Sequence, residues 1–124
     1  MEPDFDSPEL VVQRQIDAYN AKDLEALMLI YAADAEYFDF PSTLLAKGTR
    51  QFRERYGDRF TEPNLKAVIT NRVVMGPMVI DHELVNRTFP EGPGTAEFVM
   101  IYQVERGRIR RVWQIPGTRT ILPG

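Results

Sequence analysis

The stretch VVQRQIDAYNAKDLEALMLIYAADAEYFDFP, residues 11–41, places two helical patterns directly before an aromatic strand. Val12, Ile16 and Tyr19 recur at helical spacing, which predicts an amphipathic helix that ends near residue 20. Ser7 and the proline after it predict where this helix begins, because a serine oxygen accepts a free backbone N–H and proline lacks one.

The second half of the stretch predicts a short helix and a strand. Asp23 is the expected N-cap, and the following residues LEALMLIY are apolar nearly all round, which predicts a well-buried helix. Residues 35–40 are aromatic enough for a strand, and Pro41 ends it.

Beyond this stretch, one more helix precedes a series of strands. Phe52, Tyr56 and Phe60 lie four residues apart, which predicts a third amphipathic helix after a loop. From Leu65 onward, turn sequences separate four runs rich in Val, Ile, Thr and aromatic residues; the turns are MGP (75–77), PEGPG (90–94) and ERG (105–107). Only the first six residues and the tail after Pro116 are expected to be loose. This order predicts an α+β fold in which helices cover one face of a curved, mainly antiparallel sheet.

Composition narrows the functional class. The chain has 124 residues, 44% of them hydrophobic and 27% charged, which is typical of a single globular domain spanning residues 1–124. The net charge of -3 offers no basic surface for nucleic acid. The acidic, proline-interrupted start is unlike a secretory signal, and no apolar run is long enough to span a bilayer, so a cytoplasmic protein without a membrane partner is expected.

Cofactor chemistry is not expected. Cysteine is absent, so thiolate nucleophiles and thiolate metal sites are excluded. One histidine among scattered carboxylates does not form a recognisable metal-ligand cluster. The basic run RGRIRR, residues 106–111, is interpreted as a solvated strand edge.

Three segments occur in a characteristic order: residues 11–41, then KGTRQFRERY (47–56), then GRIRRVWQI (107–115). With them the sequence resembles, over nearly the whole chain, the nuclear transport factor 2-like superfamily, and within it the SnoaL-like and ketosteroid isomerase-like branch. The resemblance implies a cone-shaped fold, with three N-terminal helices packed on the concave face of the sheet and a pocket between them. It also implies a homodimer.

Strand alternation assigns side chains to this pocket. Asp39 shares a face with Tyr37, while Phe38 and Phe40 are expected to turn into the core. His82 lies on the same face of its strand as Ile80 and Leu84, and these apolar neighbours predict that it points inward. The residues predicted to line the pocket are Gln15, Tyr19, Tyr31, Tyr37, Tyr56, Leu84, Asn86, Phe98, Met100, Tyr102, Val112 and Gln114.

The resemblance also implies roles for individual residues. The proton-shuttling aspartate of the ketosteroid isomerases corresponds to Asp39, and their tyrosine network corresponds to Tyr31 and Tyr56. Their two oxyanion donors fall on Gln15 and Met100, which do not match. Since losing one such donor typically costs about 100-fold or more in rate, steroid isomerisation is not expected. The catalytic aspartate of SnoaL-type cyclases falls on Gln114.

Two functions are compatible with these residues. The first is a cofactor-independent isomerase or lyase acting on a small hydrophobic carbonyl compound, with Asp39 as general base and His82 as its partner. The second is a noncatalytic domain that binds a small hydrophobic ligand or dimerises. Plainer interpretations also stand: His82 as a core histidine bonded to a backbone carbonyl, Asp39 as a strand-end cap or a surface ion pair, and the tyrosines as pocket walls.

The opposite face of the sheet is unusually apolar. Glu97, Val99 and Ile101 alternate outward on one strand, and Trp113 lies outward on the last strand. Such a strip would be costly to expose, so it is the expected interface of the homodimer.

Overall fold

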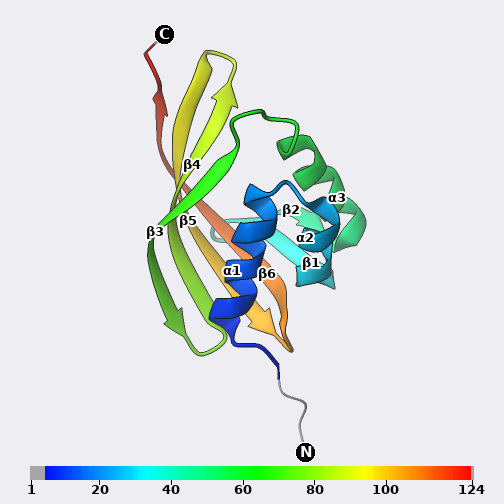
Figure 1. The fold of residues 1–124 in the computed structure, drawn as a ribbon. Helices are drawn as coiled ribbons and strands as arrows, with labels where there is room; N and C mark the ends of the chain where they lie inside the picture. The colour runs from blue at the N-terminus through cyan, green and yellow to red at the C-terminus, as the bar shows by residue number, and fades with distance from the viewer. Residues whose placement is uncertain (1–4, 124) are drawn as a thin grey trace, which may run out of the picture.

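The computed structural model describes residues 5–123, and within them the chain forms three helices and one six-stranded sheet (Figure 1). The elements in chain order are α1 (Pro8–Asn20), α2 (Leu24–Ile30), β1 (Tyr31–Asp39), β2 (Thr43–Lys47), α3 (Gly48–Arg59), β3 (Lys66–Met75), β4 (Met78–Phe89), β5 (Gly92–Glu105) and β6 (Arg108–Ile121). The α+β class predicted from the sequence is therefore confirmed. The cone shape stays a prediction.

The first two helices begin where the sequence predicts. The Ser7 side chain accepts a hydrogen bond from the backbone N–H of Leu10 at 3.2 Å, and Asp23 accepts one from Ala26 at 3.1 Å. Both are N-cap contacts that satisfy free donors in a first turn. The prediction that α2 is well buried is wrong, because only Leu27 and Met28 of this short helix are buried and Leu29 is 71% exposed.

The sheet has the strand order β2-β1-β6-β5-β4-β3. Strands β3 to β6 form the predicted antiparallel series, and β1 joins it by pairing parallel to β6. Residues 43–47, expected to be loop, form β2 along the free edge of β1. The tail after Pro116 is also not loose, since β6 continues to Ile121 beside β5.

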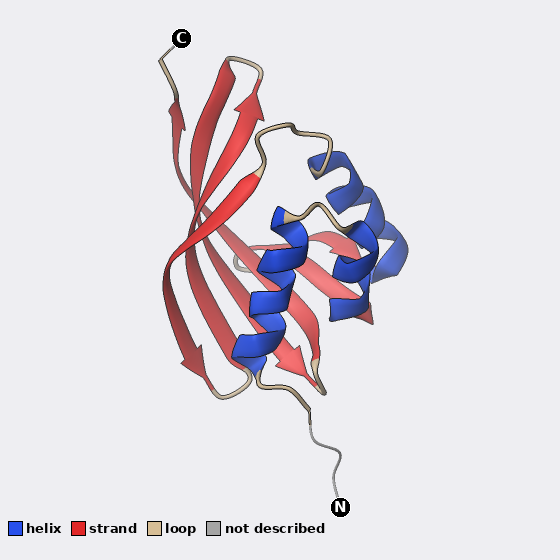
Figure 2. Cartoon of the chain, in the orientation of Figure 1, coloured by secondary structure: helices blue, strands red, loops and turns tan. Residues whose placement is uncertain are grey.

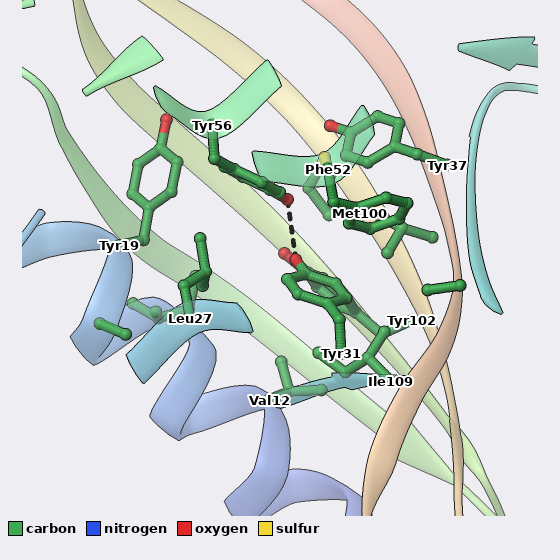
Figure 3. Packing of buried hydrophobic residues seen from close by; sticks show 14 of the residues in the cluster. Val12, Tyr19, Leu27, Tyr31, Tyr37, Phe52, Tyr56, Met100, Tyr102 and Ile109 are labelled. Carbon is green, nitrogen blue, oxygen red and sulfur yellow. Dashed lines mark hydrogen bonds between the residues drawn. The ribbon is translucent and has the colours of Figure 1, made fainter. Parts of the chain in front are cut away.

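All three helices lie on one side of the sheet (Figure 2). Two strands, β1 and β2, separate α3 from the first two helices in the sequence, so α3 is not part of an uninterrupted N-terminal helical segment. The hydrophobic core fills the space between helices and sheet, and Val12, Leu27, Phe52 and Ile109 within it are almost fully buried (Figure 3). Among residues 5–123, no helix is both long and apolar enough to cross a membrane.

Candidate functional site

A pocket lies between the helices and the inner face of the sheet. Its lining comes from α1, α3 and four strands: Gln15, Ile16, Tyr19, Tyr37, Arg55, Tyr56, Arg59, Glu83, Val85, Phe98, Met100, Tyr102 and Gln114. The cavity volume is about 50 Å³. Pockets that enclose drug-sized ligands typically measure roughly 300–1,000 Å³, so this cavity fits only a small ligand.

Glu83 on β4 is the carboxyl group that lines the pocket. Glu83 is only 5% exposed. The Tyr102 hydroxyl donates a hydrogen bond to Glu83 Oε2 at 3.2 Å. Burial disfavours the charged form, and the nearby Asp81 carboxylate adds repulsion; together they raise the pKa of Glu83 to about 8. Glu83 is therefore mostly a neutral carboxylic acid at pH 7, and can donate a hydrogen bond.

Tyr102 connects Glu83 to helix α1. Its hydroxyl lies 3.2 Å from Glu83 Oε2 and 3.4 Å from Gln15 Oε1, and both are acceptors for its single proton. Burial raises the pKa of Tyr102 well above its ordinary value, so the phenol stays neutral. When Tyr102 donates to Gln15, the acid proton of Glu83 is free for a ligand in the pocket.

Aromatic side chains form much of the remaining wall. Tyr56 lies edge-on to Tyr19, with ring centroids 6.2 Å apart, and its hydroxyl is 2.7 Å from that of Tyr31 (Figure 3). Tyr31 itself does not line the cavity and supports Tyr56 from behind. Burial raises the pKa of each of these three phenols, so all stay neutral, and Tyr19 and Tyr56 present amphipathic surfaces to the cavity.

The partly exposed end of the pocket is polar. The Arg55 guanidinium lies over the Tyr37 ring, 4.4 Å from its centroid, and its Nη2 donates to Gln114 Oε1 at 3.4 Å. The Tyr37 hydroxyl donates to the same oxygen at 3.0 Å. Gln114 Nε2 in turn donates to Asp39 Oδ1 at 3.3 Å, so Asp39 fixes the orientation of this amide.

The predicted pair of Asp39 and His82 is wrong. His82 lies on the opposite face of the sheet from the pocket, and its Nε2 contacts Glu97 Oε2 at 2.8 Å. The alternation of β4 is the reverse of the prediction: Asp81, Glu83 and Val85 are buried on the helix side. Leu84 and Asn86, predicted to line the pocket with His82, are exposed for the same reason.

Asp39 lies near the pocket but does not line it. It shares a face of β1 with Tyr37, as predicted, and reaches the cavity only through Gln114. The prediction that its two phenylalanine neighbours turn into the core is wrong. Phe38 stacks on Trp113 on the other side of the sheet, with centroids 5.8 Å apart, and Phe40 is 53% exposed.

The structure brings most of the other predicted residues to the pocket. Those that line it are Gln15, Tyr19, Tyr37, Tyr56, Phe98, Met100, Tyr102 and Gln114. Val112 is fully buried in the core beside it. Sequence reasoning missed the lining residues Ile16, Arg55, Arg59, Glu83 and Val85. The helical spacing of Ile16 with Val12 and Tyr19 was a usable signal for the first of these.

Comparison with known proteins identifies the family. Residues 12–112 match the SnoaL-like domain, so the chain belongs to the SnoaL-like family. No curated protein matches the chain significantly.

Solved structures share the fold at low sequence identity. An uncharacterised cystatin-fold protein from Novosphingobium aromaticivorans is 23% identical with a TM-score of 0.81, covering 89% of this chain and 98% of that one. An NTF2-like protein of unknown function from Cytophaga hutchinsonii is 17% identical with a TM-score of 0.74. The match covers 94% of this chain and 95% of that one. A hypothetical protein with a ketosteroid isomerase-like fold from Catenulispora acidiphila, in complex with trimethylamine, is 18% identical with a TM-score of 0.74. The match covers 88% of this chain and 85% of that one. These likenesses show a shared fold, and the match of residues 12–112 to the SnoaL-like domain confirms the SnoaL-like relationship suggested by the sequence.

Proposed function

We propose that this protein binds a small, largely apolar molecule that carries a hydrogen-bond acceptor such as a carbonyl oxygen. The supporting observation is that Glu83, a neutral carboxylic acid at pH 7, lines a pocket whose walls include five aromatic side chains. In such surroundings a neutral acid is a strong, fixed donor, whereas a carboxylate would repel an electron-rich oxygen. The Catenulispora neighbour holds a small amine, but two arginines in this pocket disfavour a cation.

Binding of butanone, a small ketone, tests this proposal, with its affinity followed by NMR shifts of pocket residues from pH 6 to pH 9. We expect affinity to fall as the pH rises through about 8, because Glu83 then loses its proton. Glu83→Gln keeps a donor in place, so its affinity is expected to be independent of pH over this range. Wild-type binding that does not change with pH, or no binding at all, would contradict the proposal.

A second candidate function is catalysis of proton transfer, as an isomerase or lyase acting on a small carbonyl compound. It is favoured because a pKa of about 8 lets Glu83 both give and take a proton near neutral pH. Met100 on β5 falls at the position of an oxyanion donor in the ketosteroid isomerases but has no proton to donate. Glu83 on β4 supplies a neutral donor instead. Asp39, the base expected from the sequence, reaches the pocket only through Gln114, so we propose that Glu83 moves the proton and that Asp39 orients the Gln114 amide.

Exchange of the butanone protons next to the carbonyl group for deuterium separates catalysis from binding alone. Faster exchange with the wild-type protein than in buffer, lost in Glu83→Gln and reduced in Asp39→Asn, is the outcome expected of an enzyme. Binding without exchange would leave the ligand-binding function and remove the catalytic one.

We also propose that the protein forms a homodimer through the outer face of the sheet. Val99, Ile101 and Trp113 are only partly covered there in the single chain, and the stacked Phe38 extends the apolar strip. Burying this strip against a second copy would remove it from water.

Light scattering at micromolar concentration tests the dimer. We expect the mass of two chains for the wild-type protein and of one chain for Ile101→Arg, because each dimer would bury introduced charges. Leu29→Arg is the matched control, since Leu29 is exposed on α2, away from this face. A wild-type monomer, or dissociation by the control substitution, would contradict the interface.

A further inference from the structure

Two arginines from one side of α3 line the pocket. Arg55 and Arg59 lie four residues apart, so their side chains emerge one above the other. Arg59 Nε is 3.5 Å from Glu62, a carboxylate that also binds Arg87 at 2.8 Å. Arg55 forms no ion pair with any residue of the described part of the chain, 5–123. This end of the pocket therefore carries more positive than negative charge.

The structure holds the Arg55 guanidinium in a defined plane. It packs over Tyr37, and only Nη2 has a protein acceptor, Gln114 Oε1, among residues 5–123. A guanidinium has five N–H donors in a fixed fork that matches a carboxylate. Most of these donors are free to bind a ligand, and the half-buried position strengthens their attraction for an anion.

The charged and neutral donors lie at different positions across the sheet. Gln114, which contacts Arg55, is on β6, and Glu83 is on β4, with β5 between them. Because neighbouring strands are about 4.8 Å apart, these two strands are separated by roughly 10 Å. Phe98 and Met100 on β5 supply apolar surface between the two polar positions. A ligand that used both would need an apolar body between an anionic end and an acceptor oxygen.

We propose that the ligand class is a small organic acid, whose carboxylate pairs with Arg55 and whose second oxygen accepts a hydrogen bond from Glu83. This inference rests on the proposed function, because it takes the same pocket and the same donor. It adds the charge of the ligand, which the neutral Glu83 alone does not determine.

The binding of 4-oxopentanoate and of its amide, 4-oxopentanamide, tests the inference at pH 7 and low salt. The two probes share their ketone, carbon skeleton and shape, and differ in the negative charge. We expect the acid to bind about 10-fold or more tightly than the amide, as one charge-assisted contact would give. In Arg55→Met, which keeps the length of the side chain, we expect the acid to fall to the affinity of the amide. Arg55→Lys is expected to restore part of the preference.

Arg50→Met is the matched control, because Arg50 is exposed on the same helix and does not line the pocket. It removes an equal charge and is expected to keep the full preference for the acid. Equal wild-type affinities for acid and amide would overturn the organic-acid inference and leave the proposed function standing. A preference that survives in Arg55→Met would overturn the role of Arg55. If neither probe shifts pocket resonances, the proposed function fails as well.

Discussion

Replacing Glu83 with glutamine is expected to stabilise the protein at alkaline pH and to leave it unchanged near pH 4. Burial raises the pKa of Glu83 from 4.5 to about 8. Between these values the unfolded chain releases this proton while the folded protein keeps it, so the wild-type free energy of unfolding falls as the pH rises. Above pH 8 the loss is complete. At about 1.4 kcal/mol per pH unit, its upper limit is roughly 5 kcal/mol.

Urea denaturation of the wild type and Glu83→Gln between pH 4 and pH 9 measures this difference. We expect Glu83→Gln to become the more stable protein by several kcal/mol at pH 9. Glu97→Gln is the control: its contact with His82 lowers the pKa of Glu97, so this substitution is expected to give no stabilisation at alkaline pH. A difference between wild type and Glu83→Gln that does not vary with pH would mean that Glu83 is ionised normally.

Replacing Asp81 with asparagine is expected to destabilise the protein by about 3–5 kcal/mol at pH 7, the range seen when one partner of a buried ion pair is removed. Asp81 is fully buried and accepts two hydrogen bonds from Arg72, at 2.6 and 2.9 Å. Arg72 also donates to Gln13 on α1 at 2.9 Å, so the pair connects the sheet to a helix. The substitution leaves the Arg72 charge largely buried without its counter-ion.

The double variant Asp81→Leu with Arg72→Met separates the loss of the pair from the burial of a lone charge. We expect it to recover much of the stability, because hydrophobic replacements of both partners are often neutral. Denaturation midpoints in urea provide the measurement. A single Asp81→Asn variant within about 1 kcal/mol of the wild type would show that this ion pair contributes little.

The strand β4 shows why sequence reasoning succeeded for most of the pocket and failed for its acid. Alternation identified the two faces of the strand correctly but not which face is inside. The face with Ile80, His82 and Leu84 looked more apolar, whereas the buried face carries two carboxyl groups. Those groups are tolerated because Arg72 pairs with one and the other is neutral.

A signal for the correct face of β4 was present in the sequence. Val79, Val85 and Phe89 lie in the same register as the buried carboxyl groups, and all three are buried. Across the tight turn at residues 75–78, Arg72 falls opposite Asp81. A cross-strand pair of opposite charges inside an apolar register could therefore have predicted a buried ion pair.

The inward residues of β5 and the helices were more predictable, since their apolar pattern coincides with burial. Met100, Tyr102 and Val104 share one face of β5 and are buried, and Tyr56 follows the helical spacing of Phe52. The contribution of Arg55 was not predictable, because a long polar side chain on an amphipathic helix usually faces solvent. Only the packing of α3 over β1 directs it toward the pocket.

The protonation state of Glu83 is central to this account, and a carbon-13 NMR titration of its side-chain carboxyl group measures it directly. The resonance can be assigned by its disappearance in Glu83→Gln. The structure predicts a midpoint near pH 8, with the neutral acid predominating at pH 7. A midpoint near 4.5, the ordinary value for a glutamate, would contradict the proposed donor and the function that depends on it.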